Sequence, residues 1–207
     1  MIKKLDVEDP EGLAPVSFRP SQEGTEVSAE VVETLPGTAP EGPPKMKYGN
    51  ALELTKDFEK FRSKSYHATD YEKEKGIWTG GYGNQTSKKK TWTEEEAEKD
   101  LIGRLDKIEG RLEKEFTEID LPTNKREALK SLIDNTGWNN FKYKKGKKEN
   151  GLTEAYKAIQ KGDWEKAAHE LFDEDVGFTK QGGKKLAGLV RRRKEEERLW
   201  SRFGQNF

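Results

Sequence analysis

The chain has 207 residues, with 39 lysines and arginines and 39 aspartates and glutamates, so one medium domain with an appendage is expected and the zero net charge gives no reason to expect nucleic acid as a partner. The absence of cysteine excludes a disulfide scaffold, a thiolate metal site and a cysteine nucleophile. No apolar run approaches the roughly 18–20 residues of a membrane span and no signal-peptide core follows Met1, so we expect synthesis in a cytosol without membrane insertion.

Residues 1–50 are predicted to form an extended, Pro-rich acidic arm. Seven of the eight prolines lie within residues 1–44, and proline fixes φ and removes an amide donor. The arm carries nine acidic and five basic residues, which gives it a net charge of −4 and leaves +4 for the rest of the chain. Its apolar residues follow no sustained period, which is typical either of a disordered leader or of an arm that orders on a partner.

A short helix and a small β region are expected after the arm. Leu54, Phe58 and Phe61 have the spacing of one helical face within residues 51–62, and Glu59 flanks that face. Residues 63–92 are rich in glycine and aromatic residues and contain turn signals. This composition predicts a β-hairpin or a three-stranded subdomain.

The clearest helix of the chain begins at a capping box that runs from Thr93 to Glu96. Apolar residues continue from Ala97 to Phe116 at spacings of three and four, which predicts one long amphipathic helix.

The second half of the chain is predicted to be helical. After Pro122, a helix that Thr123 or Asn124 can cap is expected to end at the turn 135–137. A basic loop, 142–148, precedes two short helices with Thr153 and Asp163 as caps, and a last helix carries the apolar residues between 186 and 200. The predicted fold is therefore α+β and mainly helical, with a small β lobe and a helical lobe joined by a long helix. Its domain boundaries are 1–50 for the arm and 51–207 for the folded part, with a polymer-binding groove between the lobes.

The residues between 58 and 83 have the composition of a glycosidase site. Glu59 lies at the end of a predicted helix, further carboxylates follow at Asp70, Glu72 and Glu74, and Thr79 lies on a Gly-rich, aromatic β segment. Two carboxyl groups in different environments across a cleft are what cleavage of a glycosidic bond requires, because one donates a proton and the other handles water or the developing positive charge.

These residues resemble the phage-type lysozymes, the endolysin family of T-even and lambdoid phages, which is glycoside hydrolase family 24. Four matches occur in the family's order over residues 50–204: the opening motif at Glu59, Arg62 and Tyr66; the Gly-aromatic-Thr motif over 76–83; an Asn-x-Gly turn at 135–137; and a closing signature over 182–200. The sequence departs from the family pattern at Lys60, where glycine is usual, and at Asn84, where histidine is expected.

The resemblance implies roles for several residues. It makes Glu59 the general acid and Thr79 the hydroxyl that positions water, and it places Tyr66 and Asn135 beside the sugar groove. The family aspartate has no direct equivalent, because its two spacings lead to Ala68 and Lys73 in this chain. Asp70 is the preferred candidate for a longer loop, and Glu72 and Glu74 remain open as alternatives.

Other conspicuous residues have ordinary structural interpretations. Arg191 to Arg193 are expected to mix solvated surface with pairing to acids, and Trp138, Trp164 and Trp200 are expected in the core. His67 and His169 lack metal-ligand spacing, and no metal or other cofactor is expected.

The resemblance implies a muramidase that hydrolyses, with inversion, the β-1,4 bond between N-acetylmuramic acid and N-acetylglucosamine of bacterial peptidoglycan. Two settings compete: a virion-associated enzyme whose arm, residues 1–50, docks on phage tail or internal virion proteins, and a soluble endolysin that a holin releases from the host cytoplasm. The arm favours the virion. A third alternative is a virion structural protein that keeps the fold without the activity, which Lys60, Ala68 and Asn84 would explain.

Overall fold

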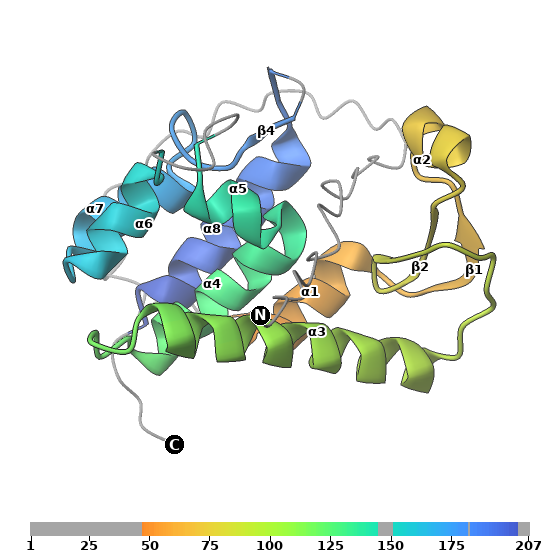
Figure 1. Cartoon of the computed structure of the whole chain (residues 1–207), viewed down its shortest axis with the longest axis horizontal. Coiled ribbons are helices and arrows are strands. Elements are labelled where there is room, and N and C mark those ends of the chain that lie inside the picture. Colours follow the sequence, from red (N-terminus) through yellow and green to blue (C-terminus); the bar gives the residue numbers. More distant parts are fainter. Residues whose placement is uncertain (1–46, 145–150, 182, 203–207) are drawn as a thin grey trace, which may run out of the picture.

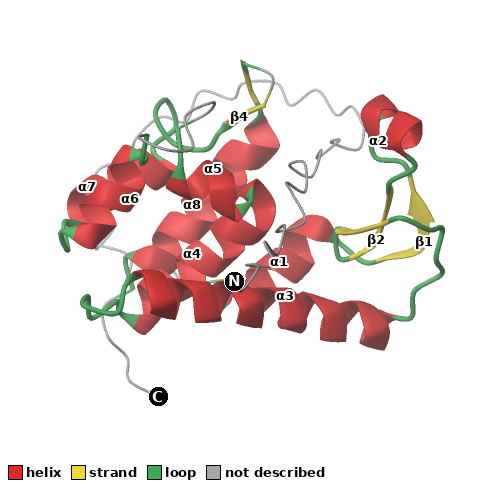
Figure 2. Ribbon diagram, in the orientation of Figure 1, coloured by secondary structure: helices red, strands yellow, loops and turns green. Residues whose placement is uncertain are grey.

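The computed structural model describes residues 47–144, 151–181 and 183–202. A small β lobe and a helical lobe are joined by one long helix, as Figures 1 and 2 show. The predicted α+β architecture is confirmed. Most of the predicted arm (1–46) and the centre of the basic loop (145–150) lie outside the described residues.

The β lobe is a three-stranded antiparallel sheet with one short helix inserted between its first two strands. Its elements, with the helix that precedes it, are α1 (Ala51–Glu59), β1 (Arg62–Tyr66), α2 (Asp70–Lys75), β2 (Trp78–Gly81) and β3 (Asn84–Thr86). The three-stranded subdomain was predicted, whereas α2 was not. It forms because the hydroxyl of Thr69 caps its first turn and Gly76, with φ of 65°, ends it in the left-handed region.

The connecting helix α3 (Glu94–Glu115) runs the length of the molecule (Figure 1). Its N-terminus has the predicted capping box: the Thr93 hydroxyl accepts from the amide of Glu96, and the Glu96 carboxylate accepts from the amide of Thr93. The buried face of α3 contains Leu101, Leu105 and Leu112, which confirms the predicted amphipathic pattern.

The helical lobe packs short helices around α4, which lies against α8. Its elements are α4 (Thr123–Thr136), α5 (Trp138–Lys142), α6 (Glu154–Gln160), α7 (Trp164–Phe172), β4 (Lys180–Gln181), β5 (Lys184–Lys185) and α8 (Ala187–Trp200). The predicted caps Thr153 and Asp163 both accept from backbone amides of their helices.

The predicted cap of α4 is wrong. Pro122 occupies the N-cap position and no side chain caps the helix. The side-chain amide of Asn124 instead donates to the carbonyls of Trp200 and Arg202, at 2.5 and 2.8 Å. It therefore ties the start of α4 to the end of α8 rather than to its own backbone.

Two hydrophobic clusters lie along α3. The larger one fills the helical lobe and includes Leu112, Leu132 and Trp200, and the smaller one, which includes Tyr82, Trp92 and Leu101, joins the β lobe to the first half of α3. Because α3 contributes to both clusters, it fixes the position of one lobe relative to the other.

Residues 47–50 pack against α1, although the sequence grouped them with the arm. Tyr48 is buried in the larger cluster, its hydroxyl bonds to Asp57, and Lys47 forms an ion pair with the same carboxylate. The side chain of Asn50 then caps α1. The packed unit thus already includes residue 47.

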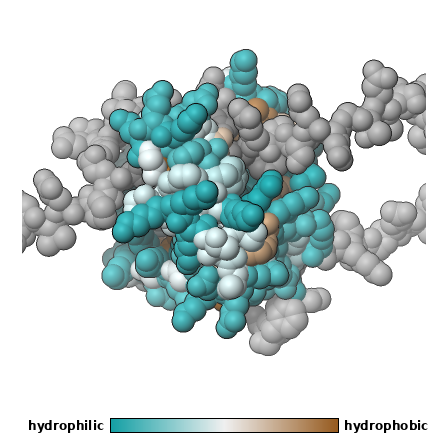
Figure 3. Space-filling model, turned by 90° about the vertical axis from the view of Figure 1, so that its right-hand side faces the viewer, coloured by the Kyte–Doolittle hydropathy of each residue, from teal (hydrophilic) through white to brown (hydrophobic). Residues whose placement is uncertain are grey.

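The β-lobe end of the molecule, which faces the viewer in Figure 3, is mainly hydrophilic. Residues 60–91 contain eight lysines and arginines and three acids, and much of this charge is exposed. Within the described residues, no helix has the length and apolar character that crossing a bilayer would require.

Candidate active site

Glu59 is the last residue of α1, at the junction of the two lobes. Helix α1 ends there because Lys60 takes a positive φ of 52°. The Glu59 side chain is 11% exposed, and its Oε1 accepts a hydrogen bond of 2.5 Å from Nη1 of Arg192 on α8. The Glu59 carboxyl group, which the sequence predicted at a helix end, therefore lies against the buried guanidinium of Arg192, 133 positions further along the chain.

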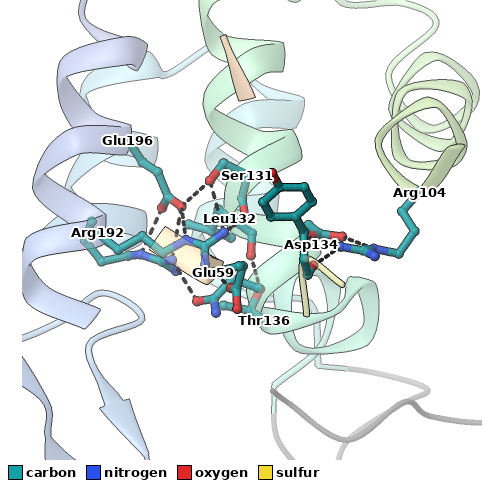
Figure 4. A network of polar contacts seen from close by, with 11 residues as sticks. Glu59, Arg104, Ser131, Leu132, Asp134, Thr136, Arg192 and Glu196 are labelled. Carbon is teal, nitrogen blue, oxygen red and sulfur yellow. Dashed lines mark hydrogen bonds and ion pairs between the residues drawn. The ribbon is translucent and has the colours of Figure 1, made fainter. Parts of the chain in front are cut away.

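Arg192 belongs to a buried group of charges that Figure 4 shows from close by. Its Nε donates to Glu196 Oε1 at 3.1 Å, and Arg193 Nε lies 2.9 Å from Glu196 Oε2. Glu196 also accepts from the hydroxyl of Ser131 at 2.7 Å. The two guanidinium groups are balanced by two carboxylates, those of Glu59 and Glu196, which is how such a cluster becomes tolerable in the interior.

The arginine pKa values reflect these surroundings. Burial opposes protonation of Arg192, but the carboxylates of Glu59 and Glu196 outweigh it and raise the pKa of Arg192 above its usual value. Burial lowers the pKa of Arg193 to about 10, although the carboxylate of Glu196 opposes that shift. Arg192 is thus firmly held as the cation beside Glu59.

Asn135, a predicted sugar-groove residue, belongs to the same group. It is buried near the end of α4, and its Oδ1 accepts from Nη2 of Arg193 at 2.9 Å. Gly137, whose φ is 83°, ends α4 as predicted. Asn135 also lines the cavity described below, which Glu59 lines as well. The structure therefore places the two predicted site residues Asn135 and Glu59 at one cavity.

The turn between β2 and β3 closes over Glu59. Gly83 in that turn has φ of 77°, and a Cβ atom there would lie 3.1 Å from Oε2 of Glu59. Glycine is required at this position both by the backbone conformation and by the approach of the carboxylate. Glycine in this motif therefore allows the β2–β3 turn to pack directly against the Glu59 carboxylate.

Glu72 is the carboxylate that lies beside Thr79. It projects from α2, it is 3% exposed, and Thr79 Oγ1 lies 3.1 Å from each of its oxygens. Its Oε2 also accepts from the amide of Ala68 at 2.6 Å, and its Oε1 accepts from Nε2 of Gln85 at 2.9 Å. Three donors from three segments of the β lobe therefore hold this carboxylate.

The two other candidates for the family aspartate lie elsewhere on the same helix. Asp70 is in the first turn of α2 and Glu74 in its second, and both side chains are exposed. The longer loop thus forms a helix that turns Glu72, rather than Asp70, toward Thr79. The Thr-x-x-Glu spacing of Thr69 and Glu72 was the sequence signal for that helix.

The sheet register brings the remaining candidates into one row. Tyr66 pairs with Thr79, and Thr79 pairs with Gln85. Directly opposed residues point to the same face of a sheet. Tyr66 is 42% exposed, and burial of its ring together with the charges of Glu59 and Glu72 raises the pKa of its hydroxyl, although Arg62 opposes the shift. Tyr66 therefore lies within electrostatic reach of both carboxylates.

A cavity of about 750 Å³ opens between the hairpin, α3 and the end of α4. Glu59 and Gln85 line it together, so one side of this cavity holds the Arg192-bound carboxylate and the other reaches Glu72 through Gln85. The rest of the wall includes Arg104, Asp134 and Trp138. Trp138, expected in the core, is only partly buried and lies at this wall.

Arg104 joins the hairpin to α3 and α4, and Figure 4 shows its pairing with Asp134. From α3 it donates to Asp134 Oδ1 at 2.9 Å, to Asp100 Oδ2 at 2.6 Å and to the carbonyl of Tyr82 at 2.8 Å. Tyr82 precedes Gly83, so this contact holds the turn that packs on Glu59. A planar guanidinium with several fixed donors suits such a three-way junction.

Sequence reasoning missed the residues that surround the two carboxylates. Arg191 to Arg193 were expected to mix solvated surface with acid pairing, and Arg191 is indeed exposed while Arg192 and Arg193 pair with acids. What the sequence did not predict is that this pair is buried and that Arg192 contacts Glu59. The one signal for them was the i, i+4 spacing of Arg192 and Glu196, which exposed helix pairs also show. Among the described residues, no group of three or more His, Cys, Asp or Glu side chains is arranged to hold a metal ion.

Comparison with known proteins shows the family of the chain. The family model for phage lysozyme matches residues 56–196, which is more than half of the chain and includes Glu59, Glu72, Thr79 and Arg192. The chain belongs to the phage lysozyme family. This is the family that the residue motifs predicted.

Individual similar proteins agree with the family match. The chain is 30% identical over 149 residues to the endolysin of Bacillus phage B103, covering 72% of this chain but only 51% of that protein. The active form of the P1 phage endolysin Lyz is similar in structure, with a TM-score of 0.59, 28% identity, and coverage of 72% of this chain and 82% of that one. The muramidase domain of SpmX from Asticaccaulis excentricus has a TM-score of 0.58 at 26% identity, with 73% and 95% covered.

Proposed function

We propose that this phage lysozyme is a muramidase, which hydrolyses the β-1,4 bond between N-acetylmuramic acid and N-acetylglucosamine of bacterial peptidoglycan. The observation that carries the proposal is one cavity lined by Glu59 and Gln85, with Gln85 bonded in turn to the second carboxylate, Glu72. The names of the similar proteins, endolysin and muramidase domain, support the same activity.

In this proposal Glu59 is the general acid. Its proton passes to the glycosidic oxygen as the bond from that oxygen to the anomeric carbon breaks. Arg192, held as a cation, stabilises the carboxylate that Glu59 becomes after the transfer. A water oxygen bonds to the anomeric carbon from the opposite face, which gives inversion.

The water-side group is Glu72 together with Thr79. Thr79 uses its one proton toward Glu72, which leaves its oxygen lone pairs free to accept from water. The water's released proton goes to Glu72. The side chains of Glu72 and Thr79 are both nearly fully buried. The water therefore approaches them beside Gln85, which pairs with Thr79 in the sheet and lines the cavity.

The test compares wall hydrolysis by the wild type, Glu59→Gln, Glu72→Gln and Asp70→Asn. We expect Glu59→Gln to abolish release of reducing ends, Glu72→Gln to lower it by about 10²–10⁴-fold, and Asp70→Asn to have little effect. Thermal unfolding of each variant separates lost chemistry from lost folding, since Glu72 is buried. Crippling by Asp70→Asn with a fully active Glu72→Gln would move the water-side role to Asp70.

An inactive wild type would overturn the muramidase proposal and favour the virion structural protein. For the reaction itself, the anomer first released from a soluble glycan, measured by NMR, distinguishes inversion from retention.

The biological setting is a separate proposal. The acidic composition of residues 1–50 favours docking on phage tail or internal virion proteins, whereas the matched relatives named endolysin favour lysis from within the host. Deleting residues 1–46 separates the two. Retained wall hydrolysis with lost incorporation into virions would establish the docking role, and a phage that still packages the deleted protein, or never packages the wild type, would exclude it.

A further inference from the structure

The net charge of zero conceals two segments of opposite charge. Residues 1–46, which exclude Lys47, contain nine acidic and four basic residues, a net charge of −5. Residues 60–91, most of the β lobe, contain three acidic and eight basic residues, a net charge of +5. The rest of the chain therefore sums to zero, and the whole charge imbalance of this protein lies in the arm and in the β lobe.

Most cations of the β lobe have no carboxylate partner. Among the residues that the structure describes, Lys90 is the only one of these eight bases that forms an ion pair, with Glu96 at 3.9 Å. Of the three acids, Glu72 is buried and hydrogen-bonded inside the lobe. Outside the lobe many bases are paired instead, including Lys56, Arg104, Arg126 and Lys142. The β lobe thus exposes positive charge that the described chain leaves unneutralised.

Several of these bases lie on two adjacent segments. Lys64 of β1 opposes Thr91 across a bridge, and the amide of Ser65 donates to the carbonyl of Lys90 at 3.0 Å, so residues 88–91 run beside β1. The exposed bases of these two segments, here called the cationic face, are Arg62, Lys64, Lys88, Lys89 and Lys90. Figure 3 views this end of the molecule, whose surface is mainly hydrophilic. Like charges held this close repel one another, which favours a negatively charged partner on this face.

The arm has the matching charge in the part of it that is nearest to the folded unit. Residues 20–44 contain five acids and no base, namely Glu23, Glu26, Glu30, Glu33 and Glu41. Lys47 is paired with Asp57 of α1, and the nine residues of α1 separate this attachment point from the β lobe by about 14 Å at 1.5 Å per residue. From Glu33 to Lys47 an extended chain covers up to about 46 Å. The acids can therefore reach the cationic face of their own molecule.

We propose that the acidic segment 20–44 binds the cationic face of the β lobe in the same molecule. Tethering raises the local concentration of the segment to about the millimolar range, so several weak, exposed ion pairs are enough to hold it. The segment then competes with other polyanions for the β lobe and limits their binding. This inference does not depend on wall hydrolysis or on a virion protein, and it goes beyond the proposed function.

The first experiment locates the arm in the full chain by paramagnetic relaxation. Because the chain has no cysteine, Ser28→Cys provides a single attachment point for a nitroxide within the acidic segment. At about 50 mM salt we expect the amides of β1 and of 88–91 to relax more strongly than those of α6 and α7, and at about 500 mM salt we expect this difference to disappear.

The outcome of the relaxation experiment decides between three occupants of the cationic face. Stronger relaxation of the β lobe within one molecule supports the proposal. Equal relaxation of both lobes overturns it and leaves the face to an external polyanion. Relaxation that arises only between a spin-labelled chain and a separate isotope-enriched chain also overturns it, because the arm would then bind a second copy.

The second experiment measures how tightly the full chain binds inorganic polyphosphate at low salt. Neutralising the arm should tighten this binding about tenfold, because several weak exposed pairs then no longer compete for the cationic face. The arm variant is Glu23→Gln/Glu26→Gln/Glu30→Gln/Glu33→Gln, which keeps the length of the chain. Unchanged affinity for polyphosphate in this variant would reject the competition.

Lysine variants test whether the cationic face is the partner of the arm. Lys64→Gln/Lys88→Gln/Lys89→Gln should abolish both the excess relaxation of the β lobe and the tenfold gain from neutralising the arm. The matched control replaces three exposed lysines that lie outside the β lobe and form no ion pair with the described residues, as Lys99→Gln/Lys161→Gln/Lys166→Gln. An equal effect of the two triple variants would show that only overall charge matters, and would overturn the proposed contact.

Discussion

Glu196 is the residue on which the buried charge cluster depends. Its carboxylate is fully buried, and it contacts both Arg192 and Arg193. Removing one partner from a buried set of charges leaves the others uncompensated, which typically costs about 3–5 kcal/mol. The orientation of Arg192, and through it the surroundings of Glu59, therefore rests on a residue that has no direct contact with the cavity.

We expect Glu196→Gln to destabilise the protein by about 3–5 kcal/mol, because two buried guanidinium groups would then share one carboxylate. Urea denaturation monitored by circular dichroism measures the change. Glu195→Gln is the control, since Glu195 pairs with a largely exposed Arg198 and is expected to matter by less than about 1 kcal/mol. Equal losses of unfolding free energy in the two variants would show that the buried cluster stabilises the protein no more than the Glu195–Arg198 pair does.

Arg104 offers a second prediction at this scale, as a positioning residue. Arg104→Met removes the contact that holds the Tyr82 carbonyl, and with it the anchor of the turn on Glu59. We expect kcat for wall hydrolysis to fall by about tenfold to a hundredfold, since small displacements of a reacting group are costly. Arg104→Lys should recover part of kcat but not all, because a lysine lacks the planar fork. A change confined to KM would contradict the assignment.

Some of these residues were visible in the sequence and others were not. Glu59 and Thr79 could be selected as candidates because they lie within one local motif, where spacing alone carries the information. The pairing of Arg192 with Glu59 could not be predicted, because the two residues are 133 positions apart and the sequence indicated only that some of Arg191 to Arg193 would pair with acids. Asp70 was preferred as the residue that a longer loop could return to the family position. The segment forms helix α2 instead, and the direction of each side chain then depends on its place around the helix axis.

At the scale of elements, predictions succeeded wherever a local signal was strong. The capping box of α3 and the glycine that ends α4 determine those boundaries, and both were confirmed. The cap of α4 failed because Asn124 has partners at the end of α8, which no local pattern reveals. Helix α2 was missed because it is six residues long and lies in a segment dominated by turn signals.

The C-terminal end of α3 gives an element-scale prediction. Glu115 binds Lys142 at 2.7 Å and also accepts from the hydroxyl of Tyr156, so it joins α3 to α5 and α6. Burial raises its pKa, but these hydrogen bonds outweigh burial and lower the pKa below its usual 4.5. A lowered carboxyl pKa stabilises the fold above the pKa of the unfolded state and loses that contribution as pH falls through the folded value.

We therefore expect Glu115→Gln to reduce the free energy of unfolding at pH 7 by about 1 kcal/mol. The difference from wild type should shrink as pH falls below about 4.5, because the wild-type carboxylate is then protonated too. Urea unfolding at pH 7 and at pH 3 tests this. A difference that is constant with pH would show that the charge of Glu115 is not what stabilises the junction.

At the scale of the whole molecule, the two hydrophobic clusters are unequal. The one in the helical lobe is much larger than the one that joins the β lobe to α3. Regions that bury less apolar surface open at lower free energies than the global transition. The β lobe, which provides Thr79 and Glu72, is therefore the less stable part of the site.

Native-state hydrogen exchange should show this directly. Amides of β1 to β3 are expected to exchange through openings of lower free energy than those of α4 and α8. Removing apolar surface from the smaller cluster, as in Leu101→Ala, should lower protection in the β lobe more than in α8. Uniform protection across both lobes would mean that the molecule opens only as a single unit.

The ion pair between Glu59 and Arg192 also has a consequence during synthesis of the protein. The two residues are 133 positions apart, and at about 5–20 residues per second a ribosome needs roughly 7–27 s to travel from one to the other. During that interval the nascent chain contains Glu59 without the cation that pairs with it. A polypeptide released before α8 is made lacks Arg192, and we expect it to lack the wall hydrolysis proposed for the full chain.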